Sequence, residues 1–168
     1  MGQLYSAVAE EATIAAQSAL GASLFIIKSA ASNGVRLREI EIGGVPGATS
    51  APQSQDFKVR IVRGATGVGT ATAGGTRLVP GNLHPLGRAA VSTVVRTPTA
   101  GAAATEGGTA IYSSTIVRGN APWKLDFSSD PALAYWCDKS SVLSILLHAT
   151  DTTVFSGTLV FEEMSKGS

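Results

Sequence analysis

The sequence predicts an all-β fold, a jelly-roll-like β-sandwich with long Gly/Thr-rich loops. Short runs of Val, Ile and Thr, which favour extended strands, recur along the 168 residues. Turn-forming residues separate these runs, and the chain contains 19 glycines. No segment has convincing amphipathic helical spacing. About nine or ten strands with long irregular connections predict a sandwich or barrel. An immunoglobulin-like sandwich is the second choice, because Cys137 is the only cysteine and the strands are too many.

The clearest expected strand covers residues 57–63, where Phe57, Val59 and Ile61 alternate with basic residues. In residues 35–42 the alternation changes parity at Arg38-Glu39, which predicts a bulge or a change of facing. Asn33-Gly34 predicts a hairpin turn, because both residues accept positive φ. Further strands are expected at 4–12, 23–29, 89–96, 109–118, 122–127, 132–137, 142–149 and 153–161. The Ala-rich segment 12–22 is expected to be a short helix or an extended link. Loops are expected at 43–55, 64–81 and 99–108.

Charge and composition limit the classes of partner. The net charge of +1 gives no argument for a nucleic-acid partner. No apolar run approaches the length of about 18 residues that a membrane span needs, and no signal peptide is apparent. Charged residues are only 15% of the chain, against an average of about 25%, which favours a surface partly covered by a partner. Residues 36–118 hold nine basic and four acidic residues, so opposite ends of neighbouring copies would be complementary. We therefore expect a homo-oligomer, a trimer or a dimer.

No motif predicts catalysis, so we expect no enzyme activity, no cofactor and no metal. The Gly-rich segment 64–76 has Thr70 where a phosphate-binding loop needs Lys. His84 lies in a loop before a proline, and His148 has only Asp151 nearby as a second metal ligand. His148 is expected at a strand edge facing solvent.

Several other groups have a structural and a functional interpretation. Glu162 and Glu163 are neighbours on one expected strand, so they face opposite ways and form a solvated strand end. Cys137 is expected to be a small buried hydrophobe. Three aromatic residues that lie close in the sequence are either packing residues or, with two nearby aspartates, a sugar-binding platform (Trp123, Tyr135 and Trp136, with Asp126 and Asp130). Arg36, Arg38, Arg60 and Arg63 are expected along one sheet face.

Four segments together resemble small structural proteins of tailed bacteriophages and prophages. They are residues 37–43, the strand 58–64 with its Thr/Gly-rich tip, residues 80–90, and the ending Ser-Gly-Thr-Leu-Val-Phe-Glu-Glu at 156–163. The resemblance covers roughly residues 20–163. It implies a virion structural protein, most concretely a capsid decoration (cement) protein. Such a protein binds and stabilises the assembled phage head, has the major capsid protein as its partner, and lies on the capsid surface after synthesis in the host cytoplasm. The alternative is a carbohydrate- or receptor-binding module of a phage tail or head fibre.

The resemblance begins near residue 20, which divides the chain. Residues 20–168 are expected to form a single β-sandwich domain. Residues 1–19 are expected to form either an N-terminal arm that reaches a neighbouring subunit or the first strand. A free arm would leave its apolar side chains in water, so the candidate partner-contact residues are Leu4, Tyr5, Val8 and Ile14.

Overall fold

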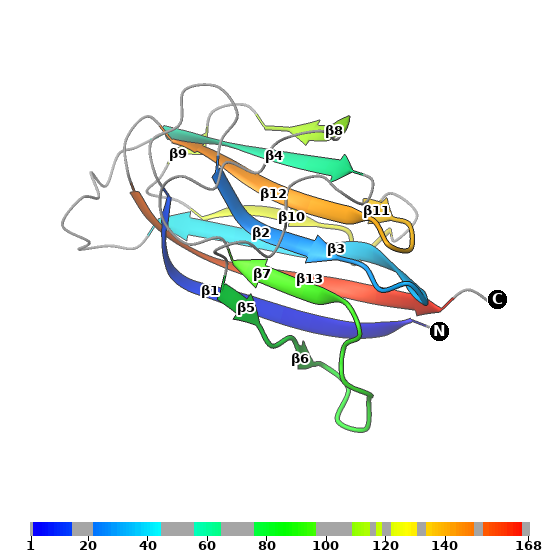
Figure 1. The fold of residues 1–168 in the computed structure, drawn as a ribbon. Coiled ribbons are helices and arrows are strands. Elements are labelled where there is room, and N and C mark those ends of the chain that lie inside the picture. Colours follow the sequence, from blue (N-terminus) through cyan, green and yellow to red (C-terminus); the bar gives the residue numbers. More distant parts are fainter. Residues whose placement is uncertain are drawn as a thin grey trace.

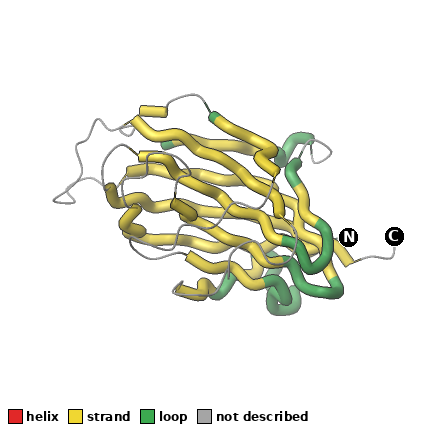
Figure 2. The backbone as a smooth tube through the Cα atoms, turned by 45° about the horizontal axis from the view of Figure 1, so that its top comes forward, coloured by secondary structure: helices red, strands yellow, loops and turns green. Residues whose placement is uncertain are grey.

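Two antiparallel β-sheets pack face to face in a computed structural model of the chain (Figure 1). The structure describes residues 2–14, 22–44, 56–64, 76–96, 109–114, 117–118, 122–130, 134–149 and 153–165. Within these ranges the chain forms strands and connections and no helix (Figure 2). The predicted all-β sandwich is therefore confirmed. The segments 65–75 and 97–108, which hold most of the expected Gly/Thr-rich loops, and the segments 15–21 and 45–55 lie outside the described residues.

The first sheet, sheet A, has six strands. Its order is β10 (Trp123–Asp126), β3 (Asn33–Gly44), β13 (Thr153–Ser165), β1 (Gln3–Ile14) and β6 (Gly81–Asn82), and β11 (Trp136–Cys137) also pairs with β3. The second sheet, sheet B, has seven strands. Its order is β5 (Thr76–Leu78), β7 (Thr93–Arg96), β2 (Ala22–Lys28), β12 (Val142–Ala149), β4 (Asp56–Gly64) and β8 (Thr109–Ser113), and β9 (Val117–Arg118) also pairs with β4.

The core lies between the two sheets, where alternate residues of each strand point inward. Phe57 of sheet B meets Phe155 of sheet A edge to face, with ring centroids 5.0 Å apart. Each large apolar side chain that is fully buried contributes about 1.5–3 kcal/mol. Gly157 lets the sheets approach, because a Cβ there would lie 3.0 Å from Leu24 Cδ2 and 3.1 Å from Phe25 Cε2. Close packing between the sheets thus explains why the Ser-Gly-Thr-Leu segment of β13 contains a glycine.

Two local predictions are confirmed in detail. Phe57, Val59 and Ile61 are buried, and Lys58 between them is exposed. The parity change in β3 is a bulge: Val160 pairs with Glu39 and Phe161 with Leu37, so Arg38 is the extra residue. The bulge explains why buried residues occur at odd positions before it and at even positions after it (Val35, Leu37, Ile40 and Ile42).

The predicted hairpin at Asn33-Gly34 is wrong. These residues begin β3 and pair with Ser165 and Met164 of β13. The strands on either side of the connection, β2 and β3, belong to different sheets. The connection therefore crosses the sandwich instead of reversing within one sheet, and the local turn signal was outweighed by long-range pairing. The short strands β5 and β6 were not predicted, and residues 89–92 precede β7 instead of forming its first half.

The interpretation of the N-terminus as a free arm is wrong, and the alternative of a first strand describes it. β1 lies inside sheet A and pairs with β13 from Gln3↔Glu163 to Ile14↔Thr153. The pairing is interrupted by one bulge between Ala9 and Ala12, where Glu11 has a φ of 47°. The small side chains Ala7, Ala9 and Ala12 face the core and let β1 lie close to sheet B. This small apolar face explains why the segment belongs to the sandwich.

Candidate interaction surface

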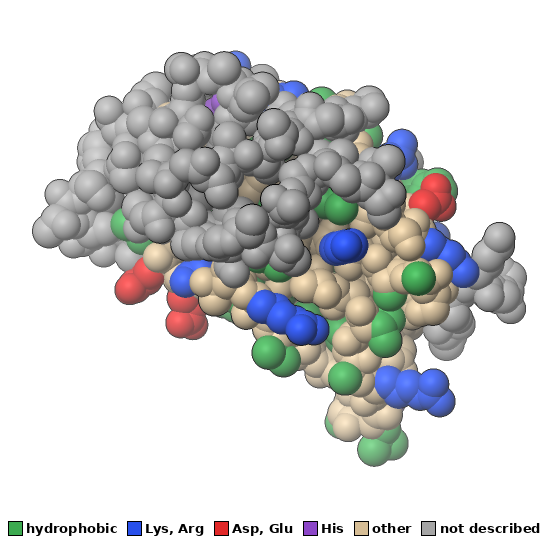
Figure 3. Space-filling model, viewed as in Figure 1, with side chains coloured by type: hydrophobic (Ala, Val, Ile, Leu, Met, Phe, Trp, Pro, Cys, Tyr) green, Lys and Arg blue, Asp and Glu red, His purple; other side chains and the backbone are tan. Residues whose placement is uncertain are grey.

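Most of the exposed large apolar side chains gather beside β1 and β6. Among the described residues they are Leu4, Val8, Val79, Leu83, Leu86 and Val91, and Trp136 lies apart on β11. Val79 and Leu86 are each 90% exposed. Residues 79–91, here called the projection, run from the end of β5 through β6 toward β7. Their turn extends beyond both sheets (Figure 1), with hydrophobic side chains at its tip (Figure 3). Clustered exposed apolar side chains rimmed by polar ones mark interaction sites.

The turn of the projection is built from polar groups that bind one another. The His84 backbone N–H donates to Asn82 Oδ1 at 2.8 Å, and His84 Nδ1 accepts from the Leu86 N–H at 3.3 Å. The Gly87 N–H donates to the His84 carbonyl at 2.9 Å. A side chain at Gly87 would overlap the Asn82 amide. With its polar groups satisfied internally, the turn leaves Leu83 and Leu86 pointing outward.

Sheet A holds the base of the projection. The Leu83 N–H donates to the Leu4 carbonyl at 3.0 Å. The Arg88 carbonyl accepts from Asn82 Nδ2 at 2.7 Å and lies 3.0 Å from the Tyr5 hydroxyl. That hydroxyl also lies 2.7 Å from Gln3 Oε1, and because it carries one proton it donates to one acceptor at a time. Both ends of the turn are therefore tied to β1.

Glu163 supplies a further link, from inside the sandwich. Its side chain is only 5% exposed, and its carboxylate accepts N–H bonds from Val91 at 3.0 and 3.2 Å and from Ser92 at 2.6 Å. Glu163 belongs to sheet A, whereas Val91 and Ser92 lead into β7 of sheet B, so the carboxylate joins the sheets below the projection. Burial and the nearby Glu163 charge raise the pKa of the Tyr5 hydroxyl. The expectation of a solvated strand end is wrong for Glu163.

Glu162 faces the other way, as expected from its position beside Glu163 in the strand. Its carboxylate lies 3.6 Å from Arg38 Nη1 on the outer face of sheet A. The two adjacent glutamates thus have different environments, because successive side chains of a strand point to opposite faces.

The four expected partner-contact residues do not form one surface. Leu4 and Val8 are 36% and 48% exposed on the outer face of β1. Tyr5 is 1% exposed and stacks on Phe161 in the core, so it is unavailable to a partner. The Ile14 side chain lies outside the described residues.

Neither the exposed apolar side chains of the projection nor the buried carboxylate beneath it was predicted from the sequence. One signal was present in the sequence. In Val-Pro-Gly-Asn-Leu-His-Pro-Leu-Gly at 79–87, large apolar residues stand among turn formers, where no strand alternation can bury them. Apolar side chains in such a turn are expected to be exposed. The burial of Glu163 had no comparable signal, because it depends on Val91 and Ser92.

The two sheets carry opposite charge. The strands of sheet B contain seven basic residues and one acidic residue, and those of sheet A contain seven acidic and three basic residues. The prediction that four arginines share one sheet face is wrong, since Arg36 and Arg38 lie in sheet A and Arg60 and Arg63 in sheet B. The basic residues of sheet B are Lys28, Lys58, Arg60, Arg63, Arg77, Arg96 and Arg118, and its acidic residue is Asp56. The acidic residues of sheet A are Glu10, Glu11, Glu39, Glu41, Asp126, Glu162 and Glu163, and its third basic residue is Lys124.

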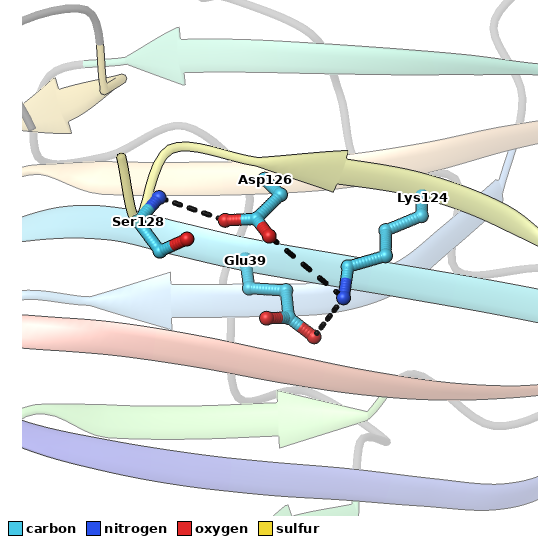
Figure 4. Close-up of polar contacts among 4 residues, drawn as sticks. All are labelled: Glu39, Lys124, Asp126 and Ser128. Carbon is cyan, nitrogen blue, oxygen red and sulfur yellow. Dashed lines mark hydrogen bonds and ion pairs between the residues drawn. The ribbon is translucent and has the colours of Figure 1, made fainter. Parts of the chain in front are cut away.

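Polar contacts on sheet A connect β3 and β10 (Figure 4). Lys124 Nζ lies 3.1 Å from Glu39 Oε1 and 3.9 Å from Asp126 Oδ2. The hydrogen bond to Glu39 raises the pKa of Lys124, and hydrogen bonds from Ser128 lower the pKa of Asp126. Because these groups are exposed, they add little stability. They fix where the charges of this surface lie.

The three expected sugar-platform aromatics are separated. Trp123 and Tyr135 are partly buried, and each packs against Tyr112 of sheet B, with ring centroids 5.9 and 6.0 Å apart. Only Trp136 is exposed, at 47%, and the Arg63 guanidinium lies 5.8 Å from the centre of its ring. The aromatics mainly close the space between β8 and β10, and they do not present one platform.

The histidines and the cysteine lie in three different parts of the fold. His148 lies on β12, between β2 and β4, and is partly buried; the prediction of a solvent-facing strand edge is wrong. His84 is exposed in the turn of the projection. Within the described ranges, no three His, Cys, Asp or Glu side chains are grouped as metal ligands. Cys137 is fully buried, as predicted.

Cys137 gives a testable consequence of burial. Burial raises the pKa of its thiol, so the group stays neutral and shielded in the folded protein. We expect a thiol reagent at about pH 8 to react with the folded chain at least about a hundredfold more slowly than with the chain in denaturant. The stability that this shift represents is present below the unfolded thiol pKa of about 8.5 and is lost as pH rises toward the higher folded value. Equal rates with and without denaturant would show that Cys137 is accessible.

No helix in the described part of the chain is long and apolar enough to cross a membrane. No family model, no curated protein and no solved structure matches this chain, and its resemblance to phage structural proteins stays a prediction from the sequence.

Proposed function

We propose that this chain is a virion structural protein, most concretely a capsid decoration protein that binds the major capsid protein of an assembled phage head. The observation that carries the proposal is the projection. Val79 and Leu86 are almost fully exposed, yet the turn that carries Leu86 is held in place by hydrogen bonds to Tyr5 and Asn82. A rigid apolar tip loses little conformational freedom on binding, which favours affinity.

The proposed mechanism is additive. Each copy buries the apolar tip of its projection on the shell. Because the protein binds the assembled head and not free capsid subunits, binding stabilises the assembled state by mass action. Contacts repeated over a symmetric shell add through multivalency.

The test is a double substitution in the projection, Leu83→Ser with Leu86→Ser. Both side chains are exposed, so the melting temperature is expected to change by about 2 °C or less. Occupancy on purified heads, measured as copies per major capsid protein by mass spectrometry, is expected to fall at least about tenfold. Burying each leucine on the shell would contribute about 1.5–3 kcal/mol, and 1.4 kcal/mol corresponds to a factor of ten.

The matched control is Trp136→Ser, which removes an exposed apolar side chain from the opposite edge of sheet A. This variant is expected to retain occupancy. If both variants bind heads as the parent does, the projection does not bind the shell. If the parent itself is missing from purified heads, the decoration proposal fails.

Trp136 supports the second candidate, a carbohydrate- or receptor-binding module of a fibre. An exposed indole ring is a surface on which a sugar can stack. A glycan array would reveal such binding, and Trp136→Ala would abolish it.

A further inference from the structure

The separation of charge between the sheets carries an inference about assembly. We infer that copies of this chain associate head to tail, with the projection of one copy and the adjoining Arg77 seated on the acidic outer face of sheet A of the next. The inference rests on the exposed tip of the proposed function and names a second copy as its partner in the absence of the shell. Because the tip seats on one surface at a time, the shell and the second copy compete for it.

The inserting surface is apolar with a basic rim. Residues 76–96 contain Arg77, Arg88 and Arg96 and no acidic residue. Arg77 and Arg88 are exposed on either side of the apolar tip that carries Leu83 and Leu86. Arg96 is turned back, and its guanidinium donates to the Glu10 carbonyl of the same chain. Such a surface fits a partner that is apolar at its centre and carries carboxylates around it.

The outer face of sheet A combines an uncharged half with carboxylates beside it. One row across the sheet runs from Val8 on β1 through Thr158 on β13 to Glu41 on β3 and Lys124 on β10. The next row runs through Ser6, Val160, Glu39 and Asp126. The half of this face on β1 and β13 is uncharged in both rows, and three carboxylates and Lys124 follow on β3 and β10. Beyond these rows, Glu162 pairs with Arg36 across the strands and lies 3.6 Å from Arg38.

The acidic half keeps unneutralised charge. Lys124 is shared by Glu39 and Asp126 and also lies opposite Glu41 across the strands, so one ammonium stands against three carboxylates. A basic rim from another copy would therefore meet a surplus of carboxylates. With a net charge of only +1, the whole chain does not oppose association with itself.

The two surfaces lie on different parts of the chain, which sets the symmetry. The projection extends past the edge of sheet A at β6, whereas the acidic face covers β1, β13, β3 and β10. A contact between two different surfaces is heterologous, and repeating it closes a ring when the rotation allows. Charge complementarity of this kind weakens as salt screens it.

Two variants test the inference without the shell. The projection variant carries Leu83→Ser and Leu86→Ser, and the face variant carries Val8→Arg and Glu41→Arg. All four parent side chains are exposed, so both variants are expected to melt within about 2 °C of the parent. In sedimentation velocity, the parent is expected to associate as its concentration rises, at least about tenfold more weakly in about 500 mM salt than in about 50 mM salt. Each variant alone is expected to be monomeric.

The decisive sample is an equal mixture of the two variants. The face variant retains a working projection, and the projection variant retains a working acidic face. One good contact can therefore form between them, and the mixture is expected to contain a 1:1 dimer and nothing larger. A parent that stays monomeric at several hundred micromolar in low salt overturns the inference. A mixture that stays monomeric, or that assembles beyond a dimer, also overturns it.

The outcomes separate this inference from the proposed function. Sedimentation uses the chain alone, whereas decoration is measured as occupancy on heads. A monomeric parent that still occupies heads would refute self-association and leave decoration intact. An oligomer that does not occupy heads would refute decoration and leave the head-to-tail contact intact.

Discussion

A chain without residues 2–14 is expected not to fold. These residues include β1, which has β13 on one side and β6 on the other. Removing them leaves one edge of β13 without its hydrogen-bonding partner and exposes the core partners of Tyr5, Ala7, Ala9 and Ala12. Only the two-residue strand β6 lies beyond β1 at this edge, but β1 pairs along most of β13 and carries four core side chains. We therefore expect its loss to exceed the total stability of a typical domain, about 5–15 kcal/mol. Circular dichroism and thermal melting of the truncated chain would show no cooperative transition.

A point variant covers the case in which the truncated chain does not accumulate. Tyr5→Ala is expected to cost about 3–5 kcal/mol, because it empties a site in contact with Phe161 and removes a bond to the projection. The matched control is Leu4→Ser with Val8→Ser, which changes only the outer side of the same strand and is expected to leave the melting temperature nearly unchanged. A truncated chain that melts within about 10 °C of the parent would restore the arm interpretation.

Glu163→Gln is expected to loosen the projection and destabilise the fold by about 1–3 kcal/mol. The carboxylate accepts from both Val91 and Ser92 N–H groups. Oε1 alone accepts from both groups, and Oε2 accepts from Val91 only. A glutamine amide oxygen at the Oε1 position would lack the negative charge that strengthens both bonds, and the NH₂ at the Oε2 position would place a donor against the Val91 N–H. Hydrogen exchange of the Val91 and Ser92 amides is expected to accelerate at least about tenfold, with a drop in melting temperature of about 3 °C for each kcal/mol.

The neighbouring Glu162→Gln is the matched control, because it makes the same chemical change on the opposite face of the same strand. It removes an ion pair of 3.6 Å with Arg38, whose expected value is about 0–1 kcal/mol. It should leave exchange of the Val91 and Ser92 amides unchanged. Equal effects of the two substitutions would show that Glu163 has no particular role in holding the projection.

The contrast between these glutamates illustrates how far the sequence could predict the candidate site. Alternation in a strand is local, and it was enough to place Glu162 and Glu163 on opposite faces. The sequence could not show which of the two is buried, because burial depends on Val91 and Ser92, some 70 residues earlier. The exposed tip of the projection was likewise missed, although its apolar residues among prolines and glycines gave a readable signal.

The all-β class, the inward residues of β4 and the bulge at Arg38 in β3 could be predicted from the residues alone, because each depends on spacing within one strand. The partners of each strand became known only from the folded chain. β1 pairs with β13, near the opposite end of the chain, and β2 and β3 are neighbours in sequence but lie in different sheets. Strand pairing also decides how charge is distributed. It places most of the basic strand residues in sheet B and most of the acidic ones in sheet A, although the sequence showed only an excess of basic residues in its middle part. The physical reason is that side-chain alternation encodes which way a residue faces, whereas the choice of neighbouring strand is made by packing between residues far apart in the chain.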